Sequence, residues 1–102
     1  MYDIRPKSGT IGDDYDKLIA SLPEEEQIKL MTTLAKYPKS LPRSMRTENV
    51  GRVEKKGKFW QYYIVSNGNR VIYDVKDRPK QVIIQFAGDH EEAAIWLRNN
   101  AR

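Results

Sequence analysis

The segment from Phe59 to Ala87 constrains the fold of this chain more than any other stretch. It reads FWQYYIVSNGNRVIYDVKDRPKQVIIQFA, which is three apolar-rich runs separated by two turn signals. β-Branched and aromatic residues dominate the runs, and this indicates strands rather than helix. The first turn signal, at 66–69, contains an Asn-Gly step that tolerates the positive φ of a tight hairpin, and the second, at 76–80, indicates a longer loop. The segment therefore predicts three consecutive antiparallel strands.

Alternation along these strands separates an apolar face from a mixed face. The apolar residues expected to be buried together are Tyr62, Ile64, Val71, Tyr73, Val82, Ile84 and Phe86. Helices on one side of the sheet would cover this face and leave the other face open. The side chains expected on the open face, and with them the functional site, are Gln61, Tyr63, Arg70, Asp74 and Gln85.

The first twenty-two residues predict a strand and a helix. Residues 2–7 are typical of a short strand, which Pro6 restricts to an edge or an end of a sheet. Asp13 or Asp14 is expected to cap the helix that follows. Its apolar positions have the spacing i, i+3, i+4 and i+7, and they are Tyr15, Leu18, Ile19 and Leu22.

A second helix is expected from Ser21 onward. Ser21 and Glu24 have the spacing of a capping box, and Pro23 suits a first helical turn. The acidic run 24–26 is favourable at a helix start, so it needs no metal to explain it. The apolar stripe expected to face the core is Ile28, Met31, Leu34 and Ala35, and Pro38 ends the helix.

The remaining segments complete one α+β domain over residues 1–102. Residues 39–46 predict a basic loop, 50–54 either a short strand or an irregular connection, and 55–58 a basic turn. Asp89 is expected to cap a final helix, whose apolar stripe is Ala93, Trp96 and Leu97. The expected fold is a helical hairpin and a short C-terminal helix packed on a mostly antiparallel four-stranded sheet.

Composition excludes several classes of site. The chain has no cysteine, which removes disulfides, thiol catalysis and thiolate metal sites. His90 is the single histidine, so a multi-histidine metal site is excluded too, and we expect no metal and no cofactor. The apolar runs are far short of the roughly 20 residues that span a membrane. The N-terminus lacks the apolar region of a signal peptide, so we expect a cytoplasmic protein with no membrane partner.

The positive charge is concentrated in the middle of the chain. Residues 39–80 hold eleven Lys/Arg and four Asp/Glu, whereas the segments on either side are each slightly acidic. The basic segment contains most of the predicted sheet. A localised basic surface attracts polyanions such as RNA or DNA, although a well-hydrated basic face without a ligand would have the same composition.

Three short motifs and the order of elements point to a family. The motifs are NGNRVIYDV at 67–75, QVIIQFAG at 81–88 and GDHEEAAIW at 88–96. An arginine after a glycine-containing turn precedes an apolar-tyrosine strand; later come a glycine, a basic residue two positions on, and an aromatic residue in the last helix. This pattern resembles the RelE/ParE superfamily of bacterial type II toxins. The motifs cover about a third of the chain, and the element order covers all of it.

The resemblance implies a microbial RNase-like fold and, in the RelE branch, ribosome-dependent cleavage of mRNA. Arg70 matches the arginine that contacts the scissile phosphate. His90 matches the basic position that several branches use as general acid, and Trp96 matches the terminal aromatic that stacks on or orients the nucleotide. The resemblance also implies a separate acidic antitoxin that wraps the basic face, and contact with operator DNA only through the antitoxin complex.

One departure from the RelE branch concerns the first of the three strands. Gln61 and Tyr63 stand where that branch has lysines, and neither replaces a lysine in proton transfer at neutral pH. Tyr63 on the open face is suited to stacking on a base or donating its hydroxyl. The basic residues expected to contact phosphate as a group, or else to form a solvated turn and loop, are Lys55, Lys56, Lys58 and Arg46.

Each principal candidate has a structural alternative. Arg70 offers planar, bidentate phosphate recognition, or it forms an ion pair with Asp74 or Asp77. His90 carries an imidazole that is suited to proton transfer, or it is an exposed histidine held by its acidic neighbours. Trp96 contacts the nucleotide, or it packs as plain core, which is the commoner fate of a helix tryptophan.

The leading hypothesis is a metal-independent endoribonuclease toxin that cuts mRNA by 2′-hydroxyl attack and inhibits translation. Arg70 would stabilise charge and His90 would transfer a proton. A ParE-like inhibitor of DNA gyrase without nuclease activity is the second hypothesis, favoured by the missing strand lysines. A catalytically inert family member that binds nucleic acid or protein is the third.

Overall fold

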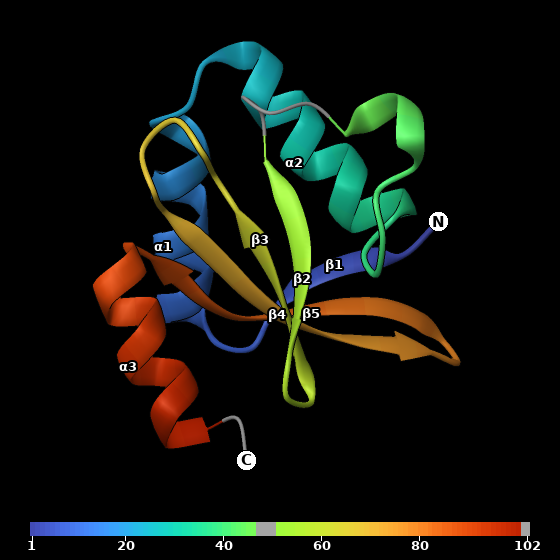
Figure 1. Cartoon of the computed structure of the whole chain (residues 1–102). Helices are drawn as coiled ribbons and strands as arrows, with labels where there is room; N and C mark the ends of the chain where they lie inside the picture. The colour runs from blue at the N-terminus through green and yellow to red at the C-terminus, as the bar shows by residue number, and fades with distance from the viewer. Residues whose placement is uncertain (47–50, 101–102) are drawn as a thin grey trace.

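The structure is a computed structural model that describes residues 1–46 and 51–100. Within them the chain forms, in order, β1 (Asp3–Pro6), α1 (Gly9–Ala20), α2 (Glu24–Lys36), the 3₁₀ helix η1 (Arg43–Met45), β2 (Arg52–Lys56), β3 (Phe59–Tyr63), β4 (Arg70–Asp77), β5 (Lys80–Gly88) and α3 (His90–Asn100). The strands form one sheet in the order β1-β5-β4-β3-β2 (Figure 1). Among the described strands, the β1–β5 pair is parallel and the other three pairs are antiparallel.

The expected α+β architecture is confirmed, but the count of four strands is wrong. The fifth strand is β2, which pairs antiparallel with β3 from Arg52 to Lys56. The prediction for 50–54 was either a short strand or an irregular connection, and Val50 lies outside the described residues. β2 therefore includes the first two residues of the predicted basic turn and forms one edge of the sheet, with β1 at the other.

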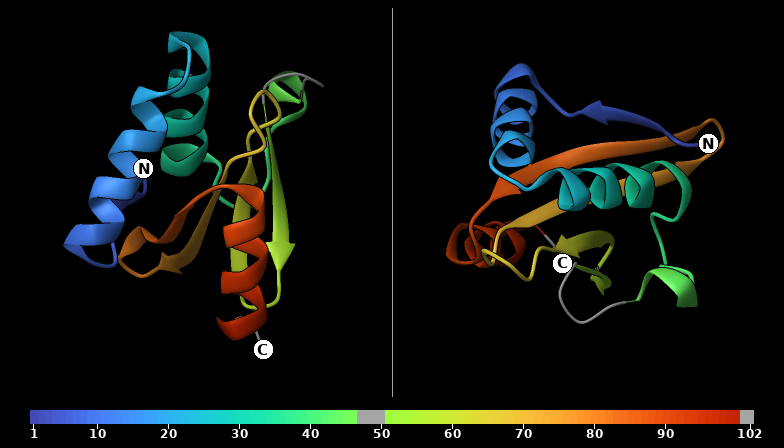
Figure 2. Two further views of the ribbon diagram at one scale, coloured as in Figure 1. Left: turned by 90° about the vertical axis from the view of Figure 1, so that its left-hand side faces the viewer. Right: turned by 90° about the horizontal axis from the view of Figure 1, so that it is seen from above.

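Helices cover both faces of the sheet (Figure 2). α1 and α2 pack on one face, where the main core includes Leu30, Leu34, Tyr62, Tyr73 and Ile84. α3 packs on the opposite face over a smaller core. That core contains Phe59, Ile72 and Ala93, with Phe86, Trp96 and Leu97 packed against it. The face expected to be open is therefore partly covered by α3.

The predicted position of Phe86 is wrong, because a β-bulge moves its side chain to the other face of the sheet. Ile72 pairs with Phe86 while Tyr73 pairs with Ile84, so Gln85 has no opposite residue. The extra residue reverses the alternation along the end of β5. Phe86 consequently packs with Ile72 beneath α3, and Ala87 joins the main core in its place.

Both helices of the hairpin begin differently from the prediction. α1 begins at Gly9, because the hydroxyl of Ser8 accepts a hydrogen bond from the backbone N–H of Ile11 at 3.3 Å. The predicted capping box between Ser21 and Glu24 does not form. The Ser21 hydroxyl instead donates to the carbonyl of Leu18 at 2.6 Å, and α2 begins after Pro23 without a side-chain cap.

α2 is rotated relative to its predicted apolar stripe. Ile28 and Met31 are 57% and 50% exposed, whereas Glu26 and Thr33 are buried. Thr33 satisfies its hydroxyl within the helix by donating to the carbonyl of Lys29 at 2.7 Å. A polar side chain with such a partner can face the core, and this is why the apolar pattern misplaced the buried face.

The two turns that flank β4 set its ends. Gly68 adopts a φ of 75° in the β3–β4 turn, as the Asn-Gly step predicted. The β4–β5 turn is tighter than predicted, since Asp77 pairs directly with Lys80. Within the described residues, no helix has the length and apolar character needed to cross a membrane.

Candidate nucleic-acid interface

A row of three residues crosses the α3 face of the sheet at the start of β4. Tyr63 is the Cα partner of Arg52 on one side and of Arg70 on the other. The Arg70 guanidinium lies 3.8 Å from the centroid of the Tyr63 ring, and the Arg52 guanidinium lies 4.6 Å from it. One aromatic ring therefore orders two cations from the neighbouring strands. We call these residues the Arg52–Tyr63–Arg70 row.

Arg70 lies on the face of the sheet that the alternation predicted. The next residue, Val71, points to the other face and belongs to the main core. Among the described residues it forms no ion pair with a carboxylate. Asp74 pairs with Lys76 at 3.2 Å, and Asp77 pairs with Lys39 at 2.9 Å. Nη1 of Arg70 is buried without an acceptor in the described part of the chain. The guanidinium is thus held by stacking, with N–H groups not committed to protein oxygens.

His90 lies at the same end of the sheet as Arg70. It is the first residue of α3, two residues after Gly88, which is the Cα partner of Arg70. Its Nδ1 lies 3.8 Å from the position that a Cβ would occupy at Gly68 in the β3–β4 turn. The imidazole is exposed and is not ion-paired to any described carboxylate.

Asp89 fixes the start of α3 and so the placement of His90. Its carboxylate accepts a hydrogen bond from the backbone N–H of Glu92 at 2.8 Å. Hydrogen bonds from the backbone of Glu92 hold the pKa of the Asp89 carboxyl below its usual range. Asp89 therefore acts as the predicted cap, and His90 follows it in the first turn.

Two of the predicted substrate-contacting residues pack within the sheet and the smaller core: Gln61 is buried, and Trp96 is partly buried. Gln61 is only 5% exposed, so its expected exposure on an open face is wrong. Trp96 packs edge-on against Phe59, with ring centroids 5.0 Å apart, and lies 6.4 Å from the ring of Phe86. These contacts account for Trp96 as part of the smaller core.

The predicted group of lysines is divided between the two faces of β2. Lys55 is the partner of Trp60, and its Nζ lies 4.5 Å from the Trp60 ring on the helical-hairpin side. Lys56 is the partner of Phe59 on the α3 side and pairs with Glu54 at 3.2 Å. Lys58 lies in the turn between the strands, 5.3 Å from the Phe59 ring. Lys55 therefore does not share a face with Arg70.

Arg46 is placed in the loop after α2 and not on the sheet. Its Nε donates to the carbonyl of Leu41 at 2.9 Å, and Nη2 donates to the Ser40 hydroxyl at 3.4 Å. Arg52 is not among the residues predicted from sequence, although its position beside Tyr63 makes it the second cation of the row. Only the register of β2 against β3 could have revealed it, and a weak alternation in 50–56 did not fix that register.

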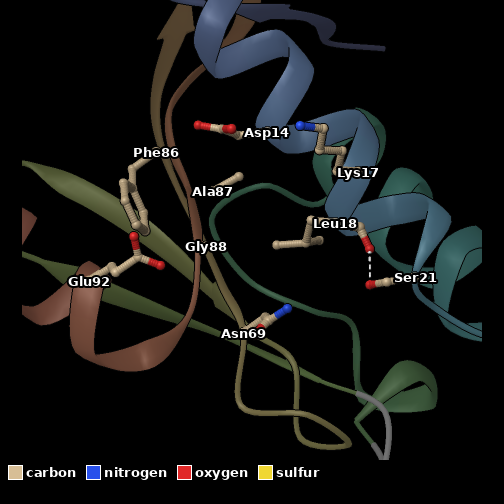
Figure 3. Close-up of a pocket in the computed structure, with 9 residues that line it drawn as sticks. All are labelled: Asp14, Lys17, Leu18, Ser21, Asn69, Phe86, Ala87, Gly88 and Glu92. Carbon is tan, nitrogen blue, oxygen red and sulfur yellow. Dashed lines mark hydrogen bonds between the residues drawn. The ribbon is translucent and has the colours of Figure 1, made fainter.

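A cleft of about 390 Å³ lies on the other side of β5, between α1 and α3 (Figure 3). Its lining includes the carboxylates of Asp14 and Glu92 together with Lys17, beside Gly88. Two carboxylates against one ammonium disfavour a polyanion. The Arg52–Tyr63–Arg70 row is therefore better suited to a phosphate than this cleft is.

Taken together, the geometry supplies two guanidinium groups, one aromatic ring and one imidazole at one end of the sheet. Guanidinium groups recognise phosphate through paired N–H donors, and an imidazole donates or accepts a proton near neutral pH. Comparisons with protein-family models and with curated proteins give no match to this chain.

Proposed function

We propose that this protein is a RelE-like toxin of a type II toxin–antitoxin system that cleaves mRNA on the ribosome in the cytoplasm. The observation that carries the proposal is the Arg70 guanidinium, stacked on Tyr63 and free of any described carboxylate, at the sheet end where His90 begins α3. The order of elements, a strand, a helical hairpin, antiparallel strands and a terminal helix, agrees with the family resemblance.

The proposed reaction is attack of a 2′-hydroxyl on the adjacent phosphate. Arg70 stabilises the charge that develops on the phosphate oxygens. His90 transfers a proton, either from the attacking 2′-hydroxyl or to the leaving 5′-oxygen. The products are a 2′,3′-cyclic phosphate and a 5′-hydroxyl end. A separate acidic antitoxin neutralises the protein by covering its basic face, and operator DNA is contacted only through that complex.

The test uses purified protein, programmed ribosomes and a defined mRNA, with mapping of the 3′ and 5′ ends that are produced. We expect cuts within translated codons and the end chemistry given above. An Arg70→Gln variant should lose cleavage, whereas Arg78→Gln, in the β4–β5 turn, removes the same charge at an exposed site and should retain it. Intact mRNA with wild-type protein would contradict the proposal.

A ParE-like inhibitor of DNA gyrase is the second candidate. It is favoured by β3, which carries buried Gln61 and stacked Tyr63 where the RelE branch has lysines. A gyrase supercoiling assay run beside the cleavage assay separates the two functions. If neither mRNA nor gyrase is affected, the assays support the third hypothesis. It is a catalytically inert family member that binds nucleic acid or protein.

A further inference from the structure

A second basic cleft adjoins the Arg52–Tyr63–Arg70 row. It has a volume of about 240 Å³ and is lined by Lys39, Ser40, Leu41, Arg46, Arg52 and Val53. Three of these side chains are cationic and none is a carboxylate. The cleft lies between the loop that follows α2 and the start of the edge strand β2. We call it the loop cleft.

Hydrogen bonds hold the cations in this cleft while leaving donors free. Arg46 is fixed at the wall by its bonds to Leu41 and Ser40. Lys39 pairs with the exposed carboxylate of Asp77 at 2.9 Å, and Arg52 pairs with the half-buried carboxylate of Glu54 at 3.1 Å. A lysine has three N–H donors and an arginine five, so each of the three cations has donors beyond those used. An anion in the cleft would accept them.

Arg52 belongs both to the loop cleft and to the row, so the two basic features are continuous. The Arg52 and Arg70 guanidinium groups lie 4.6 and 3.8 Å from the same Tyr63 ring centroid, close enough together for one phosphate to contact both. Beyond Arg52, the loop cleft adds Lys39 and Arg46. Two adjacent sets of cations that share Arg52 suit successive phosphates of one polynucleotide strand better than a single small anion.

We propose that the loop cleft is a second phosphate subsite, which binds a phosphate of the RNA strand flanking the one at Arg70. This inference rests on the proposed function, because it takes the phosphate at Arg70 as its starting point. The subsite contributes affinity and register along the strand and takes no part in bond breaking.

The test compares Ser40→Asp with Ser44→Asp. Ser40 lines the cleft, whereas Ser44 is an exposed residue of η1 that does not. Both variants add one negative charge to the same loop, and only the first places it among the three cations. The probe is a short single-stranded oligodeoxynucleotide, which cannot be cleaved because it lacks the 2′-hydroxyl, and the readout is the slope of log affinity against log salt.

Each phosphate contact contributes about 0.7 to that slope for a single strand. We expect Ser40→Asp to weaken binding about tenfold and to lower the slope by about 0.7, with Ser44→Asp close to wild type. A Lys39→Gln/Arg46→Gln double variant should give the same loss, and circular dichroism verifies that each variant is folded.

Three outcomes overturn the inference in distinguishable ways. If Arg70→Gln lowers the slope while Ser40→Asp and the double variant leave it at the wild-type value, the second subsite is wrong and the proposed function stands. If wild-type binding is indifferent to salt, the phosphate site at Arg70 fails and the subsite fails with it. Equal effects of Ser40→Asp and Ser44→Asp would show a general charge effect and also reject the subsite.

Discussion

Arg70 and Tyr63 are Cα partners across β3 and β4, and the guanidinium lies 3.8 Å from the ring centroid. Stacking uses the flat face of a guanidinium and leaves its N–H groups in the plane, where they can pair with phosphate oxygens. The ring therefore orients Arg70 without competing for its donors. An ion pair with an aspartate would have occupied some of these donors.

The first prediction concerns Arg70 itself. Arg70→Gln should reduce cleavage of ribosome-bound mRNA about a hundredfold or more, the usual effect of removing a charge-stabilising group. Arg70→Lys keeps the charge but loses the planar fork and the stack, so it should recover only part of the activity. Single-turnover cleavage rates measure both variants. Equal rates for Arg70→Lys and wild type would show that charge alone is sufficient and contradict the role of the stack.

The second prediction distinguishes the catalytic role of His90 from any role of the acidic residues beside it. His90→Gln keeps polarity and approximate size but cannot titrate, and it should reduce the cleavage rate by about a hundredfold. The thermal midpoint should stay near wild type because the side chain is exposed. Glu91→Gln is the control at the next exposed position of the same helix. A fully active His90→Gln protein would remove His90 from the mechanism.

Much of the fold could be predicted from sequence because periodicity identifies strands and their faces. The alternation in 59–87 assigned Tyr62, Val71 and Tyr73 to one core and Arg70 to the opposite face, and both assignments are confirmed. Phe86 was misplaced because one extra residue in β5 reverses the alternation, and an isolated bulge leaves no signature in residue type. The start of α1 was missed because Ser8 stands before a glycine-containing stretch that reads as a loop.

The candidate site was predicted less completely than the fold, since it depends on register between strands. Arg70 and His90 were identified from motifs, but Arg52 required knowing that β2 pairs opposite Tyr63. Lys55 and Lys56 are adjacent in sequence, and alternation in an edge strand sends them to opposite faces. The two lysines were grouped because they are neighbours in the sequence, but the sheet places their side chains on opposite faces.

The third prediction tests whether Trp96 serves the core. Trp96→Ala should lower the free energy of unfolding by about 3 kcal/mol, because it removes the contacts with Phe59 and Phe86. Trp96→Phe should retain most of the stability. Ile95→Ala is the control, since Ile95 is 52% exposed on the same helix. Urea denaturation measures all three, and an unchanged midpoint for Trp96→Ala would contradict the packing role.

The fourth prediction follows from Asp77. Hydrogen bonds from Lys39 and from Tyr2 hold the pKa of the Asp77 carboxyl below its usual range. A carboxyl with a lowered folded-state pKa contributes stability above its unfolded pKa and loses that contribution as the pH falls through the folded value. Asp77→Asn should therefore melt below wild type at neutral pH, and the difference should shrink at pH values under about 4.

Asp13→Asn provides the comparison for that titration, because Asp13 is exposed in α1 without a hydrogen bond or ion pair to a described side chain. Thermal melts across the acid range should show a smaller difference from wild type for this variant at every pH. A difference for Asp77→Asn that stays constant with pH would contradict the electrostatic account and leave a change in local packing as the cause.

The last prediction concerns Gly51, at the entry to β2 and so to Arg52. Gly51 has a φ of 131°, and a Cβ built there would lie 2.4 Å from the Tyr62 hydroxyl oxygen. Tyr62 is buried in the main core and cannot move aside. Gly51→Ala should therefore combine backbone strain with a clash and lower the free energy of unfolding by about 2 kcal/mol or more.

Gly9→Ala is the matched control for Gly51→Ala, since a Cβ at Gly9 meets nothing within 4 Å and alanine favours the start of α1. This variant should be neutral or stabilising by up to about 1 kcal/mol. Because Gly51 adjoins Arg52, Gly51→Ala should also weaken oligonucleotide binding at temperatures where the protein remains folded. If Gly51→Ala unfolds at the same urea concentration as wild type and binds equally well, the close approach of Tyr62 to the Gly51 backbone is not a constraint on β2.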